Sequence, residues 1–150
     1  MRTAQDILNS KPPIFNFIDA DSRVIEGLQL MNSVNLSYLV VMKEGEFQGI
    51  FSERDYSRNV ILKGLASHSA TIREVMSTFL PVIGPLETVE KCMQLLNSHK
   101  TRYLVVFNDD QQFQGVVTIN DVLREAISNR ELVFDQAEFS QAIELQDKIF

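Results

Sequence analysis

Apolar residues form two kinds of pattern along the chain, short continuous runs and a spacing of three and four residues. The same order of these patterns occurs twice. Short apolar runs typical of buried strands occupy residues 14–18, 38–42 and 47–51, and again 80–83, 103–107 and 113–117. After the first run of each set, apolar residues recur three and four positions apart, which predicts a helix with one buried face. These helices are expected to begin at Ser22 and Thr88, and a second helix in each copy at Ser52 and Thr118. The expected order is therefore β-α-β-β-α, twice.

The two copies also share residues in register. The segment QLMNS at 29–33 returns as QLLNS at 94–98, and FQGIFS at 47–52 returns as FQGVVT at 113–118. Ordered self-similarity of this kind identifies an internal repeat. We divide the chain into a first repeat at residues 1–65, a second at 66–130, and a C-terminal tail at 131–150.

One copy is too small to bury its own apolar sheet face well, so the two copies are expected to pack face to face. The prediction is an α+β fold whose repeats are related by a pseudo-twofold axis, with equivalent clefts between them. The tail is predicted to be a helix with an apolar stripe interrupted by Gln146, in which we place Phe139, Ala142, Ile143, Leu145 and Ile149. Such a helix is marginal alone and should dock, either on its own repeats or on a second subunit.

Composition and charge exclude several classes of function. The 150 residues carry a net charge of −6, with 14 Lys and Arg against 20 Asp and Glu, so a nucleic-acid partner is not expected. His68 and His99 have no ligand-spaced partners, and we expect no metal site. The lone Cys92 excludes an intramolecular disulfide and favours a reducing, cytoplasmic location. No signal peptide or membrane span is apparent, so no membrane partner is expected.

Two heptapeptides in register carry a resemblance to a known family. GIFSERD at 49–55 and GVVTIND at 115–121 share the pattern Gly-apolar-apolar-Ser/Thr-x-x-Asp, and each ends a β-α-β-β-α unit. The chain closely resembles the CBS domain family, whose tandem pair forms a Bateman module, and in particular small bacterial proteins made of a CBS pair and little else. The resemblance implies a non-catalytic regulatory protein that forms a homodimer and acts on a protein effector.

The resemblance also implies a ligand. It would be AMP, ADP, ATP or another adenosine compound such as NAD(H) or S-adenosylmethionine, and by position the Ser or Thr and the Asp of each motif would hold its ribose and phosphate. The residues carried over are Ser52 and Asp55 in the first copy and Thr118 and Asp121 in the second, with Ile18, Ala20, Tyr38, Ile83, Pro85 and Tyr103 framing adenine. Arg54 lies inside the first motif, near enough in the sequence to reach a phosphate. The chemistry is sound, because an ionised carboxylate accepts strong hydrogen bonds from ribose hydroxyls. A helix start also favours phosphate.

Other interpretations stay open. Both Ser/Thr-x-x-Asp patterns are also capping boxes, which need no ligand. Tyr38 and Tyr103 could stack on adenine or fill the clefts, so a ligand-free interaction module is an alternative. A nucleotide-processing enzyme is the remaining alternative, but the sequence shows neither a metal-binding carboxylate cluster nor an activated nucleophile. We interpret Cys92 as a small residue within a buried helix face.

Overall fold

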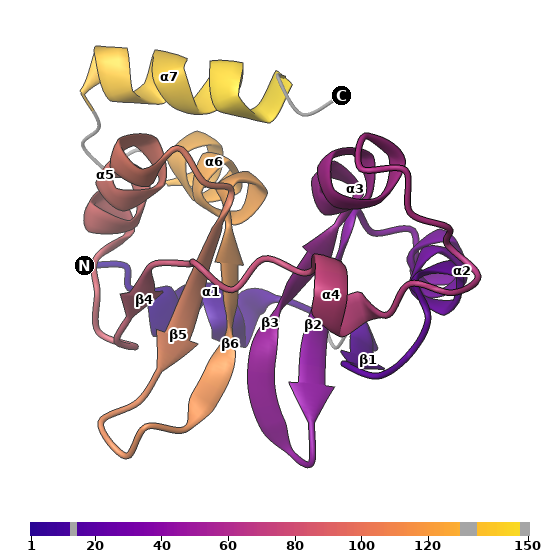
Figure 1. The fold of residues 1–150 in the computed structure, drawn as a ribbon. Coiled ribbons are helices and arrows are strands. Elements are labelled where there is room, and N and C mark those ends of the chain that lie inside the picture. Colours follow the sequence, from indigo (N-terminus) through magenta and orange to yellow (C-terminus); the bar gives the residue numbers. More distant parts are fainter. Residues whose placement is uncertain (13–14, 130–134, 148–150) are drawn as a thin grey trace. The chain divides into compact units, whose positions relative to one another are not determined.

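The computed structural model describes residues 1–12, 15–129 and 135–147, and the chain divides into two compact units (Figure 1). Unit 1 comprises Met1–Pro12 and Leu80–Phe150, and unit 2 comprises Pro13–Phe79. The N-terminal segment therefore belongs to the same unit as the second copy of the repeat. The two units are described separately below.

Unit 2 contains a three-stranded sheet and the helices of the first copy. Its elements are β1 (Phe17–Asp19), α2 (Val24–Val34), β2 (Tyr38–Lys43), β3 (Glu46–Ser52), α3 (Glu53–Asp55), the π-helix η1 (Tyr56–Ile61) and α4 (Ile72–Val75). The strand order is β1-β2-β3, with β1 parallel and β3 antiparallel to β2. Fully buried side chains such as Leu39, Phe51 and Val60 form one apolar core beneath the helices.

Unit 1 repeats this plan, with its leading helix α1 in the place of α4, and adds one helix at its C-terminal end. Its elements are α1 (Ala4–Ser10), β4 (Val82–Ile83), α5 (Val89–His99), β5 (Tyr103–Phe107), β6 (Phe113–Thr118), α6 (Ile119–Ser128) and α7 (Gln136–Asp147). The sheet order is β4-β5-β6, again with one parallel and one antiparallel pair. Met93, Leu96 and Leu104 lie at the centre of its core.

The expected α+β fold and the β-α-β-β-α order are confirmed in both copies. The differences are local. The first helix of copy one is capped at Arg23 rather than Ser22, because the Glu26 carboxylate accepts a hydrogen bond from the Arg23 N–H at 2.9 Å. The second helix of copy one is also split, since α3 passes directly into the π-helix η1, whereas α6 is regular.

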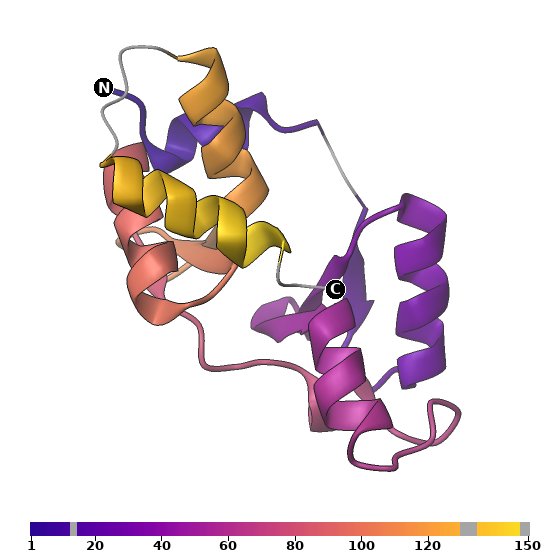
Figure 2. The same ribbon diagram turned by 90° about the horizontal axis from the view of Figure 1, so that it is seen from above.

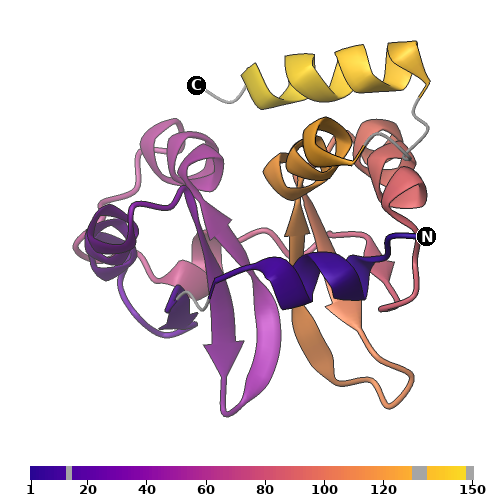
Figure 3. The same ribbon diagram turned by 180° about the vertical axis from the view of Figure 1, so that it is seen from behind.

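The short helix at the start of each copy packs on the sheet of the other copy. Helix α1 lies along β6 within unit 1 (Figure 3), and Thr3 forms a backbone bridge with Thr88. In unit 2, the segment after α4 pairs with β3 through Ser77. The Ser77 N–H donates to the Ile50 carbonyl at 2.8 Å, and the Ser77 carbonyl accepts from the Ile50 N–H at 3.0 Å. Each unit is thus built from both halves of the sequence repeat.

The predicted C-terminal helix is present as α7, and it docks on α5 and α6 of its own unit (Figure 2). Ala142 is fully buried, with Phe139 and Leu145 packed beside it. The predicted stripe is wrong at Ile143, which is 40% exposed because the docked face follows residues three apart. Gln146, which interrupts the apolar stripe, donates a hydrogen bond from its side-chain amide to Asn120 Oδ1. Ile149 lies outside the described residues.

Candidate functional site

In unit 2, the motif residues Ser52 and Asp55 meet where strand β3 becomes helix. The Asp55 carboxylate accepts hydrogen bonds from the backbone N–H and the hydroxyl of Ser52, both at 2.9 Å. Its other oxygen accepts one from the Ser77 hydroxyl at 2.5 Å. Asp55 is buried, and this desolvation raises the pKa of its carboxyl despite the hydrogen bonds and the nearby charge of Arg54. Its direct hydrogen-bond partners in these contacts are uncharged.

In unit 1, the equivalent residues Thr118 and Asp121 form the same N-terminal cap on α6. The Asp121 carboxylate accepts from the Thr118 N–H at 2.9 Å, and the Thr118 hydroxyl accepts from the Asp121 N–H at 3.2 Å. Here the acid is also paired with two cations, Lys11 at 2.9 Å and Arg124. The Asp121 side chain is only 2% exposed, so this charged group is buried but compensated.

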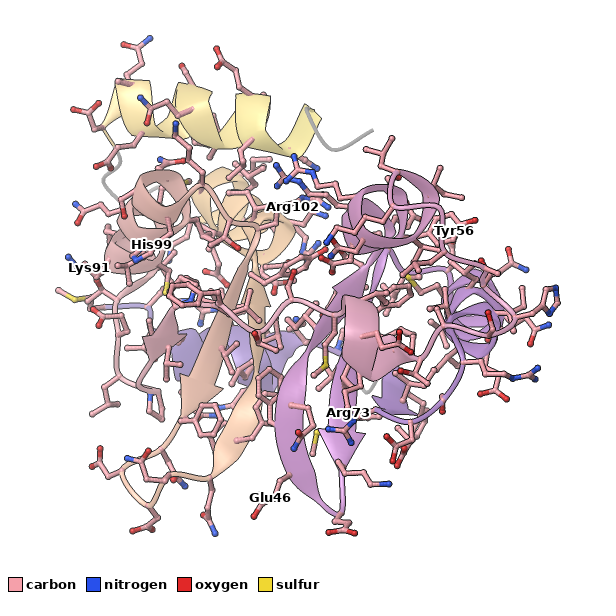
Figure 4. All side chains as sticks on the ribbon, in the orientation of Figure 1. Glu46, Tyr56, Arg73, Lys91, His99 and Arg102 are labelled. Carbon is pink, nitrogen blue, oxygen red and sulfur yellow. The ribbon has the colours of Figure 1, made fainter. Side chains whose placement is uncertain are left out.

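The two predicted tyrosines lie at the same end of their sheets as the motif residues. Tyr38 pairs directly with Ser52 across β2 and β3, and Tyr103 pairs with Thr118 across β5 and β6. Both tyrosines are buried. Arg102, labelled in Figure 4, precedes Tyr103 in the sequence. Its guanidinium carbon lies 5.9 Å from the centroid of the tyrosine ring, and its carbonyl accepts a hydrogen bond from the first N–H of α6. Cationic and aromatic groups therefore gather where α6 begins.

The remaining predicted residues are not brought to this end of the sheets. Ile18 pairs with Val41, and Ile83 pairs with Val106, each three residues beyond the tyrosine on the neighbouring strand and so about 10 Å along it. Both isoleucines are buried in the apolar cores, as is Ala20. Pro85 lies farther on, where its carbonyl accepts a hydrogen bond from Gln5 N–H at 2.9 Å. An adenine contact from these four residues stays a prediction.

Comparison with known proteins agrees with this architecture. The sequence profile of the CBS domain matches the chain twice, over residues 4–61 and 72–128. The chain belongs to the CBS domain family. The tandem arrangement inferred from the repeat is therefore confirmed.

Other members of the family resemble this CBS pair in sequence and in structure. It is 31% identical over 134 residues to the mitochondrial CBS domain-containing protein CBSX3 of Arabidopsis thaliana, covering 83% of this chain but only 65% of CBSX3. A putative signal-transduction protein with CBS domains from Burkholderia ambifaria superposes with a TM-score of 0.77 at 27% identity, covering 87% of this chain and 98% of that one. CBSX2, solved in complex with AMP, has the same fold, with a TM-score of 0.68 at 20% identity over 87% and 99% of the two chains.

Three site residues of this CBS pair were missed in the sequence. Lys11 and Ser77 reach the motif acids from the leading segment of each copy, and the Val116 carbonyl accepts a hydrogen bond from Lys11 at 2.9 Å. The only signal in the sequence is the similarity of the two leading segments, TAQDIL at 3–8 and TIREVM at 71–76, which both have the pattern of a capped helix start. This pattern does not say where either segment docks.

Two further groups bear on possible chemistry. Cys92 is fully buried, and desolvation raises the pKa of its thiol to about 12, so it is a packed side chain and not an activated nucleophile. Within residues 1–12, 15–129 and 135–147, no cluster of His, Cys, Asp and Glu could hold a metal ion. No helix in the same ranges is long and apolar enough to cross a membrane.

Proposed function

We propose that this CBS pair is a regulatory module that binds an adenine nucleotide and catalyses no reaction. The observation that carries the proposal is the repeated site, in which a buried carboxylate sits beside a hydroxyl at a strand-to-helix junction in each unit. A ribose presents hydroxyl donors that suit such a carboxylate. The AMP complex of CBSX2, which shares the fold, supports the choice of ligand class.

Unit 1 is proposed as the stronger nucleotide site. The N-terminus of the ten-residue helix α6 is the positive end of the helix dipole, which favours an anion. Lys11 and Arg124 contact Asp121 directly, and Arg102 lies at the same junction. In unit 2 the corresponding carboxylate is bonded to the Ser52 and Ser77 hydroxyls. The cations of unit 1 would attract the phosphates of a nucleotide more strongly than these hydroxyls would.

The first test is the thermal stability of the full chain with AMP, ADP, ATP, NADH and S-adenosylmethionine. A ligand that binds only the folded state at a hundredfold over its Kd adds about 2.7 kcal/mol. For a chain of this length the midpoint should rise by roughly 5–10 °C. If none of the five compounds raises the midpoint at millimolar concentration, the nucleotide proposal is rejected. A ligand-free interaction module then becomes the better description.

Single-residue variants separate binding from capping. Asp121→Ala is expected to weaken binding by tenfold or more, because a charge-assisted contact is lost. Glu74→Ala is the matched control, since Glu74 completes an exposed capping box with Thr71 on α4. The control should lose about 1 kcal/mol of stability and keep its affinity. Equal affinities in calorimetry for wild type and Asp121→Ala would show that Asp121 is only a cap.

We also propose a homodimer formed through helices, which would pass the nucleotide signal to a protein effector. Its support is a pair of equivalent positions in the repeat, Ile61 and Ile127, which are 55% and 76% exposed although both are large and apolar. The double variant Ile61→Glu/Ile127→Glu should be monomeric in light scattering. Leu86→Glu, at a position 81% exposed in a loop, is the control and should leave the mass unchanged. A wild-type monomer at micromolar concentration would contradict the dimer. The cytoplasmic location stays a prediction.

A further inference from the structure

The geometry points to Lys11 as a ligand-contacting residue of unit 1. We propose that Lys11 and Asp121 together recognise the vicinal diol of a ribose, so that this site binds ribonucleotides in preference to 2′-deoxyribonucleotides. The inference rests on the proposed function and deepens it, because it assigns sugar specificity to a residue of the first sequence repeat that contacts the motif acid of the second. Lys11 follows α1 directly, as its C-terminal cap residue.

Lys11 is held firmly in place. Its ammonium donates one hydrogen bond to Asp121 Oδ2 and one to the Val116 carbonyl, each at 2.9 Å. An ammonium has three N–H donors. Among the residues that the structure describes, the third donor has no hydrogen-bond acceptor, and the side chain is 19% exposed. One donor therefore remains for a ligand oxygen beside Asp121.

The Asp121 carboxylate can accept a further bond as well. A carboxylate offers about four lone-pair positions. Three are engaged by the Thr118 N–H, Lys11 and Arg124. The Arg124 side chain is 67% exposed, so it can turn toward solvent or a phosphate, and a ligand hydroxyl then takes its place on the carboxylate. Lys11, mostly buried and bonded twice, is expected to stay.

This pair matches a diol in hydrogen-bonding capacity. Each ribose hydroxyl both donates and accepts. One hydroxyl can donate to Asp121 while the other accepts from the third N–H of Lys11. A 2′-deoxyribose lacks one of the two hydroxyls, so either Lys11 or Asp121 has no hydrogen bond to the ligand. Because both groups are largely buried, this unmade hydrogen bond lowers the binding affinity. In unit 2, Ser77 supplies an uncharged hydroxyl to Asp55, and no ammonium contacts that acid in the described residues.

The test compares the Kd of AMP with that of 2′-deoxy-AMP by calorimetry. All proteins carry Asp55→Ala, so that unit 1 reports alone. The wild-type Lys11 protein should prefer AMP by about tenfold or more, and Lys11→Met should reduce the preference to about threefold or less. Lys91→Met is the matched control, since Lys91 is an exposed lysine on α5 of the same unit, and it should keep the full preference.

The outcomes separate this inference from the function on which it rests. If none of AMP, ADP, ATP, NADH and S-adenosylmethionine binds the wild-type chain, the proposed function fails. If AMP binds the wild-type chain but not the Asp55→Ala protein, unit 1 is not the AMP site and the inference is overturned. If AMP binds and Lys11→Met keeps the wild-type preference, the function stands and the role of Lys11 is overturned. Should Lys11→Met not fold, Lys11→Arg is used, because a planar guanidinium cannot place the same three donors. An unchanged preference in that variant also overturns the inference.

Discussion

Gly49, the first residue of the motif in unit 2, has no room for a side chain because the segment after α4 packs against it. A Cβ built on Gly49 would lie 2.5 Å from the Ser77 carbonyl oxygen and 3.2 Å from the Met76 sulfur. The first atom is backbone, and it accepts the hydrogen bond from Ile50 N–H. The clash therefore cannot be relieved by turning a side chain. Gly49→Ala must push the segment after α4 away from β3.

The cost can be estimated from these contacts. Forcing an extra methyl into a packed site costs about 1–3 kcal/mol. The two backbone hydrogen bonds between Ile50 and Ser77 add about 1 kcal/mol each if the displacement breaks them. We expect Gly49→Ala to lower the free energy of unfolding by about 3–5 kcal/mol. That is a large share of the stability of an ordinary domain.

Urea denaturation of the ligand-free protein measures this loss. Gly84→Ala is the control, because a Cβ there meets no atom within 4 Å and the backbone φ is not positive. It should be neutral, or slightly stabilising by up to about 1 kcal/mol. If Gly49→Ala loses less than about 1 kcal/mol, the packing argument is refuted.

Three further predictions concern Asp55, Cys92 and α7. The raised pKa of Asp55 means that the folded state holds its proton more tightly than the unfolded state, whose value is near 3.8. The difference in free energy of unfolding between wild type and Asp55→Ala should therefore grow in favour of wild type as the pH falls through the raised pKa toward 3.8. Thermal melts of both proteins across pH 4–7 measure this difference, and the absence of a trend with pH would contradict the prediction. Cys92 should react with a thiol reagent at pH 8 at least about a hundredfold more slowly in the native protein than in urea, and rapid native labelling would contradict its burial. Ala142→Glu, which buries a charge, should release α7 and speed limited proteolysis there, whereas Ile143→Ala, at a 40% exposed position, should not.

The internal repeat made most of the fold predictable. Strand-like apolar runs and helical spacing recur in the same order, so an uncertain element in one copy is supported by its equivalent in the other. The hairpins and the helix starts at Ser52 and Thr118 were found in this way. Capping is a local interaction, since at a helix start an acid three residues after a Ser or Thr contacts that residue without help from distant parts of the chain.

The surroundings of the motif acids were decided only by the tertiary structure. Asp121 and Lys11 are 110 residues apart, and Asp55 and Ser77 are 22 apart. A leading helix of seven or four residues cannot bury an apolar face alone, so its position depends on the sheet edge that receives it. The two copies present similar edges, and their sequences do not distinguish between them.

The same limit explains why the sequence did not give the distance between the motif and the residues predicted to frame adenine. Comparison of the two copies placed Ile18 and Ile83 on the first strand of each copy. The register of that strand against its neighbour then determines at which end of the sheet each isoleucine lies. Register is fixed by pairing between strands that lie far apart in the chain. The sequence alone therefore determined the elements, their order and the local caps. Only the tertiary structure determined which charged groups surround each acid.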